Sequence, residues 1–313
     1  MKLKPLVRGV ASYLPGVNFY FSKETGGTDS ARYCYSVWLR HLVMAFTNRL
    51  NCDVKRVAEL GPGDSLGVGI AALLSGCERY FAFDVVPHAY AERNLKIFDE
   101  LVTLFRRRAA IPANDEFPEV KPVLGNYEFP KQILTDERLN DALSEYRLDE
   151  IRKSIVDTDC EDSLIRYRVP WYDLNVIEHE SVDMIYSQAV LEHVDDLTNT
   201  YRTMRAWLKP DGYVSNQVDF RCHGTADEWN GHWMYSDLTW TLMRGRRPYL
   251  LNREPHSSHI RFLEEQNFSI VCDQTVKSVS RLPKEILAGR FRSMSDDDLT
   301  TSGAFIQAVK RPR

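Results

Sequence analysis

The amino-acid sequence predicts an α/β protein with a doubly wound, mostly parallel sheet. The first observation is a strand–turn–helix–strand unit, in which RVAEL is followed by a glycine-containing turn, the apolar stretch LGVGIAALLSGC and the second strand RYFAFDVV. The second observation is that strand and helix patterns alternate again from SVDMIYS onward. This alternation is typical of parallel sheets, because the crossover between two parallel strands is usually a helix.

The remaining elements follow from the spacing of the apolar residues. Helical spacing recurs in five further segments, at residues 30–50, 89–109, 136–146, 148–156 and 196–208. Strand patterns recur at residues 164–168, 181–187, 213–220, 268–276 and 302–311. Pro210-Asp211-Gly212 predicts a turn before the strand at 213–220.

The third strand of the sheet comes late in the chain. We interpret residues 96–160 as a helical insertion before it, since α/β connections are usually short and long ones are often functional. Residues 1–50 are expected to form an N-terminal cap and helix. Residues 51–313 are expected to form one domain, with a second, substrate-side insertion at 221–264.

Composition excludes several classes of protein. The chain has 313 residues, of which 43% are hydrophobic and 27% charged, so it is neither disordered nor fibrous. Forty basic and 44 acidic residues give a net charge of −4, which argues against a nucleic-acid partner.

The sequence also predicts a cytoplasmic protein. No apolar run approaches the ~20 residues that a transmembrane helix needs, and Arg8 and Pro15 interrupt any signal-peptide pattern near the N-terminus. The six cysteines are far apart and form no C-x-x-C pair. Reduced, buried thiols are therefore expected rather than disulfides or a structural zinc site.

A candidate ligand site follows the first two strands. Glu59, Gly61 and Gly63 lie where the first strand ends, and Asp84 lies where the second ends. Ligands of open α/β sheets bind beyond the carboxyl ends of the strands. Glycines there allow a close approach of the backbone, and a carboxylate can accept hydrogen bonds from both hydroxyls of a ribose.

Two details distinguish between nucleotide cofactors. A dinucleotide motif needs G-x-G-x-x-G, but position 66 is Leu66 and the third glycine is Gly67. Glu59 would be unfavourable beside a pyrophosphate, but it suits a ligand that carries an ammonium group and no phosphate. S-adenosylmethionine is such a ligand, and NAD(P) remains the alternative.

Four segments in this order, ELGPGDSLG, FDV, SVDMIYSQAVLEHV and LKPDGYVSNQVDF, resemble the core motifs of class I S-adenosylmethionine-dependent methyltransferases. The resemblance is to the group whose fourth motif reads vLEHv, and it covers roughly residues 55–95 and 164–220. It implies a Rossmann-like, seven-stranded sheet, mostly parallel with an antiparallel last strand. The long helical insertion before the third strand departs from the family pattern.

The resemblance also implies roles for individual residues. Glu59, Gly61 and Gly63 would line the methionine end of the cofactor, and Asp84 would bind the ribose. The remaining cofactor contacts are Asp173 to the adenine amino group, and Ser187 with Gln188 beneath the sulfonium.

Methyl transfer to an atom that must lose a proton benefits from a general base. Candidate bases after the fourth and fifth strands are His193, Asp219, His223 and His232. We expect His223 to be the base and His193 to be the second choice; His193 could equally be a polar residue at a helix start. Asp219, His223 and His232 fit no tight metal-binding motif, so no metal site is expected.

The nature of the acceptor is narrowed by motifs that the sequence lacks. SQAV stands where nucleic-acid amino methyltransferases carry Asn/Asp-Pro-Pro-aromatic, and neither a nucleophilic cysteine nor the paired glutamates of arginine methyltransferases occur nearby. This leaves small-molecule, sugar or lipid acceptors, and we expect O-methylation of a small-molecule or saccharide-like acceptor.

A cluster of arginines bears on the charge of that acceptor. It consists of Arg244, Arg246, Arg247, Arg253 and Arg261. Their guanidinium groups could bind an anionic acceptor, or they could form a solvated basic face paired with acids elsewhere. Two other functions stay open at this point: an NAD(P)-dependent oxidoreductase, and a non-catalytic module that binds S-adenosylmethionine. The sequence does not indicate an oligomeric state.

Overall fold

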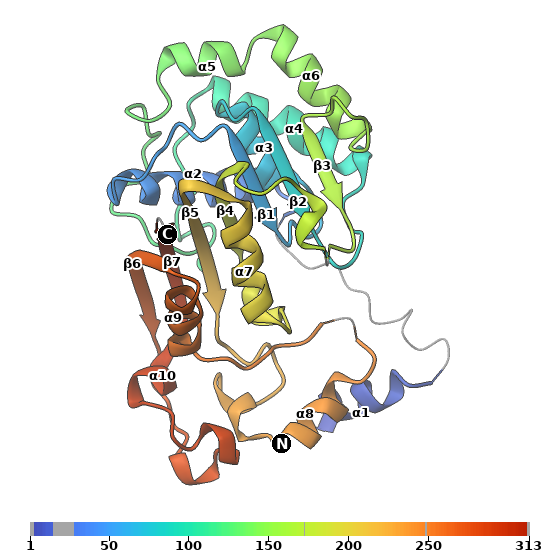
Figure 1. The fold of residues 1–313 in the computed structure, drawn as a ribbon, viewed down its shortest axis with the longest axis vertical. Helices are drawn as coiled ribbons and strands as arrows, with labels where there is room; N and C mark the ends of the chain where they lie inside the picture. The colour runs from blue at the N-terminus through green and yellow to red at the C-terminus, as the bar shows by residue number, and fades with distance from the viewer. Residues whose placement is uncertain (1–2, 15–27, 172, 248, 312–313) are drawn as a thin grey trace.

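The computed structural model describes residues 3–14, 28–171, 173–247 and 249–311, and its centre is a seven-stranded sheet (Figure 1). The strands are β1 (Arg56–Leu60), β2 (Arg79–Phe83), β3 (Ile165–Arg168), β4 (Val182–Gln188), β5 (Leu208–Asp219), β6 (Phe268–Lys277) and β7 (Thr301–Lys310). Their order is β3-β2-β1-β4-β5-β7-β6, and β7 is antiparallel to both of its neighbours while the other pairs are parallel. The predicted seven-stranded, mostly parallel sheet is confirmed.

One strand begins earlier than predicted. Val182 pairs with Leu208, but Met184 already pairs with Tyr213, so residues 209–212 bulge out of β5. The predicted turn at Pro210-Asp211-Gly212 is this bulge, in which Asp211 has a φ of 62°. The turn residues therefore interrupt the register of a longer strand instead of preceding a shorter one.

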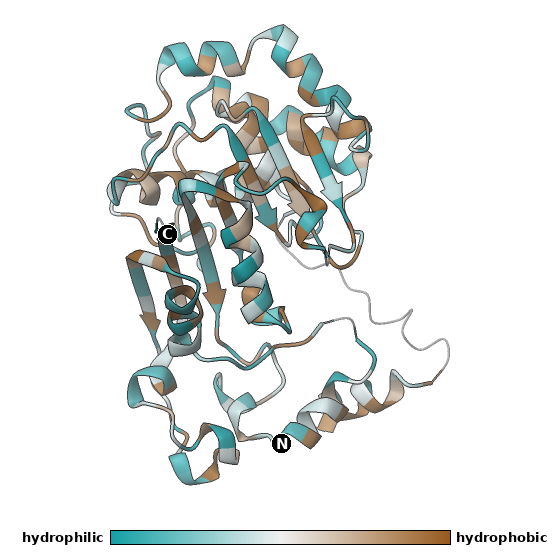
Figure 2. Cartoon of the chain, in the orientation of Figure 1, coloured by the Kyte–Doolittle hydropathy of each residue, from teal (hydrophilic) through white to brown (hydrophobic). Residues whose placement is uncertain are grey.

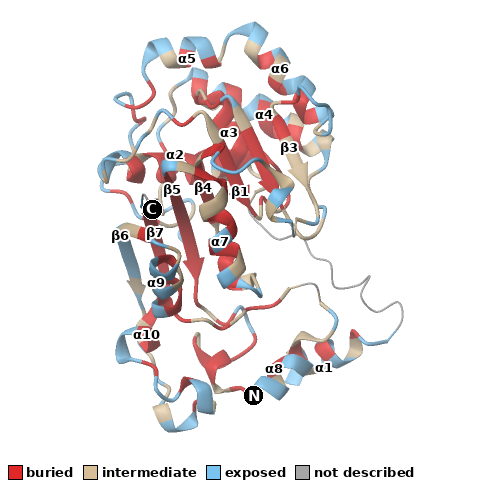
Figure 3. Cartoon of the chain, in the orientation of Figure 1, coloured by how far each residue is buried: buried red, intermediate tan, exposed pale blue. Residues whose placement is uncertain are grey.

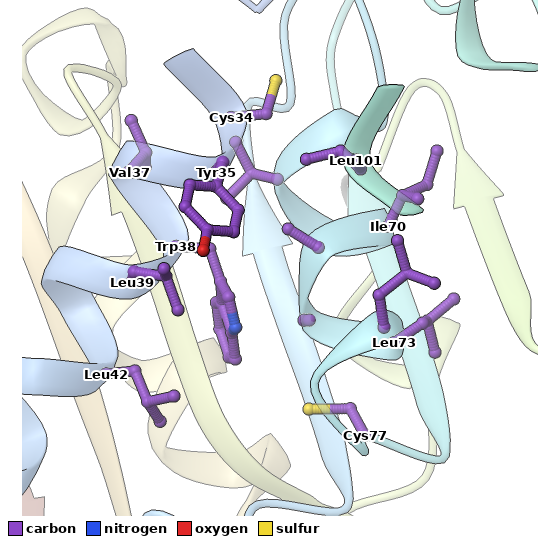
Figure 4. Close-up of a cluster of buried hydrophobic side chains, with 14 of the residues drawn as sticks. Cys34, Tyr35, Val37, Trp38, Leu39, Leu42, Ile70, Leu73, Cys77 and Leu101 are labelled. Atoms are coloured by element: carbon purple, nitrogen blue, oxygen red, sulfur yellow. The ribbon is translucent and has the colours of Figure 1, made fainter. Parts of the chain in front are cut away.

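Helices cover both faces of the sheet (Figure 1). One face carries α2 (Ala31–Thr47), α3 (Gly67–Leu74) and α4 (Ala91–Arg106); the other carries α7 (Leu197–Trp207) and α9 (His256–Glu265). Every residue of α3 is buried, because this helix is enclosed by the sheet, α2 and α4. Figure 4 shows the resulting core, in which Trp38 of α2 also donates a hydrogen bond of 2.8 Å to Ser75.

Two helices occupy the predicted insertion before the third strand. They are α5 (Asp136–Ala142) and α6 (Glu145–Val156), and they pack against α3 and α4. The preceding loop is fixed by the buried Arg40, whose guanidinium donates to the carbonyls of Pro112, Val120 and Pro122. The limits 96–160 stay a prediction, and their first eleven residues belong to α4.

The N-terminal helix lies apart from the sheet. Helix α1 (Leu3–Ala11) packs on α8 (Asp237–Arg244), which belongs to the predicted 221–264 insertion (Figure 1). Leu3 and Val7 of this helix are exposed. Figure 2 shows that hydrophobic and hydrophilic residues alternate along it. Residues 15–27 of the predicted N-terminal cap lie outside the described residues.

The other short elements complete the chain. They are η2 (Leu174–Val176), η3 (Leu191–His193), η4 (Gly231–Met234), η5 (Lys284–Ile286), η6 (Gly289–Phe291) and α10 (Asp296–Thr300). Figure 3 shows that the central strands are buried whereas β6 is an exposed edge. No helix among the described residues is long and apolar enough to cross a membrane.

Candidate cofactor and acceptor site

A cavity of about 500 Å³ opens at the carboxyl ends of β1, β2 and β4, where the strand order reverses. Reversal points of this kind are the usual ligand sites of open α/β sheets, and the volume suits a ligand of nucleoside size. The predicted residues that line the cavity are Glu59, Gly61, Gly63, Asp84, Gln188 and His193. Asp173, Ser187 and His223 are not among the lining residues.

The glycine loop after β1 needs the two glycines that the sequence places there. Gly61 and Gly63 have φ angles of 67° and 73°, in the region that favours glycine. A Cβ atom on Gly61 would also lie 2.5 Å from Cγ2 of Val190. The loop therefore brings bare backbone to the cavity wall, which leaves room for a ligand to approach it.

Asp84 follows β2 and is held by backbone donors. Its Oδ1 accepts a hydrogen bond of 2.7 Å from the amide of Val85, and its Oδ2 accepts a longer one of 3.4 Å from the amide of Gly63. Burial raises the pKa of this carboxyl above its usual value. Because a carboxylate can accept about four hydrogen bonds, Asp84 retains acceptor capacity for ligand hydroxyls.

Glu59 is buried in β1 and also reaches the cavity. The hydroxyls of Tyr80 and Tyr186 both donate to its Oε2, so Oε1 is the oxygen available to a ligand. Burial raises the pKa of Glu59 to about 8, although these two hydrogen bonds oppose the rise. A cationic group in the cavity would favour the ionised carboxylate.

Gln188 ends β4 and is oriented by a residue that the sequence did not single out. Its Oε1 lies 3.1 Å from Nε2 of His41, whose Nδ1 lies 2.7 Å from the hydroxyl of Ser215. The neighbouring Ser187 is fully buried and donates to Asn216 at 2.9 Å. Ser187 thus supports the cavity wall from behind.

Asp173 lies on the exposed side of the loop after β3. Its carboxylate caps η2 by accepting a hydrogen bond of 2.8 Å from the amide of Asn175. Trp171, two residues earlier, lines the cavity instead. The sequence offered no signal that distinguished the two.

The two predicted histidines lie together. The ring centroids of His193 and His223 are 5.1 Å apart, and Nδ1 of His193 is buried with no hydrogen-bond partner. Burial lowers the pKa of His193 to about 4, with a smaller contribution from His223, so its imidazole is neutral at pH 7. His223 does not line the cavity, and its Nε2 lies 3.3 Å from Oδ2 of Asp219.

Glu192 precedes His193 in the LEH segment, and the sequence suggested for it only a polar position at a helix start. Its side chain is buried and neither carboxyl oxygen has a hydrogen-bond partner. Burial raises its pKa well above the usual value. Three residues, Glu192, His193 and His223, each offer one atom that could bind a metal ion. These three atoms lie within 4.8 Å of one another. His232, by contrast, is buried with its ring 4.7 Å from that of Trp233.

A family model described as a methyltransferase domain matches residues 35–272 of this chain. The chain belongs to this methyltransferase family. Together with the seven-stranded sheet, the match makes it a class I S-adenosylmethionine-dependent methyltransferase, and therefore an enzyme. It also decides against the oxidoreductase and the non-catalytic module.

Solved structures similar to this methyltransferase share little sequence with it. A methyltransferase from Methanosarcina mazei is 12% identical, with 86% of this chain and 97% of that chain covered and a TM-score of 0.44. One from Mesorhizobium loti is 12% identical, with 86% and 98% covered and a TM-score of 0.42. Phosphoethanolamine N-methyltransferase 2 of Haemonchus contortus, in complex with S-adenosylmethionine, is 13% identical, with 99% and 58% covered and a TM-score of 0.43. No curated protein matches the sequence.

The residues of the cavity fit the cofactor of the family. The bare backbone at Gly61, the spare acceptor capacity of Asp84 and the available oxygen of Glu59 suit a nucleoside that carries an ammonium group. S-adenosylmethionine is the cofactor of this methyltransferase.

Proposed function

We propose that this methyltransferase transfers the methyl group of S-adenosylmethionine to an oxygen atom of a small-molecule or saccharide-like, anionic acceptor. The observation that carries the proposal is the position of the His193 imidazole, which lines the same cavity as Glu59 and Asp84. The cofactor supplies an activated methyl group, so the protein has to align the acceptor, exclude water and accept a proton. A hydroxyl loses its proton during methyl transfer, so it is an acceptor group that benefits from such a proton acceptor.

The cofactor contacts follow from the lining of the cavity. Glu59, Gly61 and Gly63 are proposed to bind the methionine end, and Asp84 the two ribose hydroxyls. Gln188 is proposed to lie beneath the sulfonium, with Ser187 supporting it through the strand. Asp173 remains the proposed partner of the adenine amino group.

His223 and His193 are the proposed catalytic residues on the acceptor side. Sequence reasoning ranked His223 first, but the lining of the cavity supports His193 as the imidazole that meets the acceptor. His223 would then act on the acceptor from the outer side, where its ring contacts that of His193.

The proposed anionic character of the acceptor rests on the arginine cluster, of which Arg244 reaches the cavity lining only through Asp195. Arg244 pairs with Asp195, a residue that lines the cavity. Burial lowers the pKa of Arg247, and repulsion from Arg8 and Arg244 lowers it further, which indicates a positive local field. Pairing with acids, the other interpretation, describes Arg244 with Asp195, Arg253 with Asp237 and Arg261 with Glu265.

We also propose the cytoplasm as the location of this enzyme, with no nucleic-acid partner. The described cysteines are all free, which agrees with a reducing compartment.

Calorimetric titration of S-adenosylmethionine tests the cofactor contacts. Asp84→Asn removes the charge that strengthens hydrogen bonds from the ribose, so we expect the Kd to rise at least tenfold, which is about 1.4 kcal/mol or more. Asp84→Ala should abolish measurable binding. Asp115→Asn, which changes an exposed aspartate, should bind like the parent protein.

A turnover assay tests the acceptor. Formation of S-adenosylhomocysteine is measured with hydroxylated acceptors that do or do not carry a carboxylate or phosphate, and with matched amines. We expect turnover with the anionic hydroxyl compounds. Turnover with amines alone would refute O-methylation, and equal turnover with neutral alcohols would refute the anionic acceptor.

A further inference from the structure

Glu192, His193 and His223 form a cluster that the fold supports from several sides. Glu192 and His193 belong to η3, and His223 lies in the loop after β5. Only 3% of Glu192 is exposed, yet its carboxyl oxygens have no side-chain partner and approach only the backbone amides of Glu192 and Asp219, and Nδ1 of His193 has no partner. Buried polar atoms without partners are rare in folded proteins, and a bound ion is one of the features that explain them.

The backbone of this cluster is fixed. The side-chain amide of Asn252 donates to the carbonyls of Leu191 and Val194 at 2.7 and 2.8 Å, and its backbone amide donates to the carbonyl of Glu192 at 2.7 Å. These three bonds hold η3 in place from a segment sixty residues later in the chain. The unpaired side chains therefore stand on a rigid support.

His223 has the kind of neighbour that metal-bound histidines usually have. Asp219 lies 3.3 Å from its Nε2 and is itself held by the guanidinium of Arg221, whose Nε is 2.8 Å from Oδ1. A carboxylate in this position orients the imidazole of a metal ligand. Asp219 is thus a positioning residue for His223.

We infer that Glu192, His193 and His223 bind one divalent transition-metal ion of the zinc type. Two imidazoles and one carboxylate form the ligand set of catalytic zinc sites, which keep a further position open. Ligand atoms around a tetrahedral zinc ion are about 3.4 Å apart, whereas here they lie within 4.8 Å, so small side-chain rotations close the site. His193, which lines the cavity, connects this site to the acceptor side.

The role of the ion rests on the proposed O-methylation. An acceptor hydroxyl that binds the ion loses its proton to solvent more readily, as metal-bound water does. The resulting oxygen anion attacks the methyl carbon; the O–C bond forms while the C–S bond breaks, and its electron pair stays on sulfur. Nitrogen atoms that bind the ion cannot accept that proton, so in the metal-loaded enzyme the ion replaces the histidine base.

Metal titration of the full chain tests the site without cofactor or acceptor. After removal of metals with a chelator, Zn²⁺ is titrated by calorimetry, and Co²⁺ by its visible absorption. We expect one ion per chain, with affinity reduced at least tenfold in His223→Ala and in Glu192→Gln. His179→Ala, which removes an exposed histidine at the opposite end of β4, should leave the affinity unchanged.

His223 is one-third exposed, so its replacement spares the core, and circular dichroism checks the fold of Glu192→Gln. Absence of one-to-one binding, or equal affinity in His223→Ala and the parent protein, would overturn the site. Asp84→Asn should retain metal binding, which separates this test from that of the cofactor contacts. If chelation leaves turnover unchanged, the proposed role of the ion in methyl transfer is wrong.

Discussion

At the scale of single residues, the Glu59 carboxyl links the buried side of the sheet to the cavity. Two tyrosine hydroxyls occupy one of its oxygens, and burial raises its pKa to about 8. Without a ligand the carboxyl is therefore protonated at neutral pH. An ammonium group beside Oε1 would bind the ionised form, so binding of the cofactor and loss of this proton are coupled.

This coupling predicts the pH dependence of cofactor affinity. Below pH 8 a proton must leave Glu59 when S-adenosylmethionine binds, so affinity should rise from pH 6 to pH 8 by up to tenfold per unit. Above about pH 8 the α-amino group of the ligand loses its own proton, and affinity should fall again. Calorimetry across this range measures the effect. Glu59→Gln should flatten the acid side of the profile; an unchanged slope would exclude Glu59 as the ammonium partner.

At the scale of elements, the loop between β1 and α3 depends on backbone geometry that only glycine adopts easily. Gly61→Ala combines a φ of 67° with a Cβ 2.5 Å from Val190. We expect the free energy of unfolding to fall by about 1–3 kcal/mol and the Kd for S-adenosylmethionine to rise at least tenfold. Urea unfolding and calorimetry measure the two effects.

Two further variants separate the steric contact with Val190 from the backbone strain at Gly61 as causes of the lost stability. Val190→Ala combined with Gly61→Ala removes the close contact but not the backbone strain, so it should restore part of the lost stability. Gly125→Ala is the control, because a Cβ there meets no atom within 4 Å. Full cofactor affinity in Gly61→Ala would show that the loop does not approach the ligand.

The sequence predicted elements well where one helix or strand carries its own pattern. The strands at 56–60 and 165–168 and the buried helix α3 are of this kind, since apolar residues and glycine punctuation mark them locally. It failed at the 209–212 bulge, because the register of β5 depends on how β4 pairs with it.

The candidate site also contains residues that local sequence patterns reveal and residues whose roles depend on distant contacts. Glu59, Gly61 and Asp84 lie next to strand ends that the sequence reveals, so their convergence could be predicted. Glu192 and His41 gain their roles only through distant contacts, the first from a segment near Asn252 and the second from Ser215. No local pattern in the sequence carries that information.

At the scale of the whole molecule, several histidines are held neutral in the interior. His41 of α2 lies 2.7 Å from the hydroxyl of Ser215 in the sheet, Nδ1 of His259 lies 2.9 Å from the hydroxyl of Tyr201, and His232 packs against Trp233. Burial lowers their pKa values to about 4, 3 and 3, and neighbouring positive groups add to the effect for the latter two. Protonation in the unfolded chain therefore pulls the protein toward unfolding in acid.

The sign and size of this effect give a prediction for global stability. Each histidine with a lowered pKa contributes stability above pH 6.5 that is lost as the pH falls, by about 1.36 kcal/mol per unit. Glu59, whose pKa is raised, works in the opposite direction between pH 4.5 and 8. Four histidines, with His193 included, work against the two carboxyls of Glu59 and Glu192, so the net loss is on the order of 3 kcal/mol per unit between pH 6 and 4.5.

Urea unfolding at several pH values, with a chelator present, measures this slope. His259→Asn keeps an acceptor for the Tyr201 hydroxyl while removing the titration, so its slope should be smaller by about 1.4 kcal/mol per pH unit. His179→Asn, an exposed position, should have the slope of the parent protein. Equal slopes in all three proteins would mean that His259 becomes protonated within the folded state, because a histidine that titrates alike in both states contributes nothing to the pH dependence of unfolding.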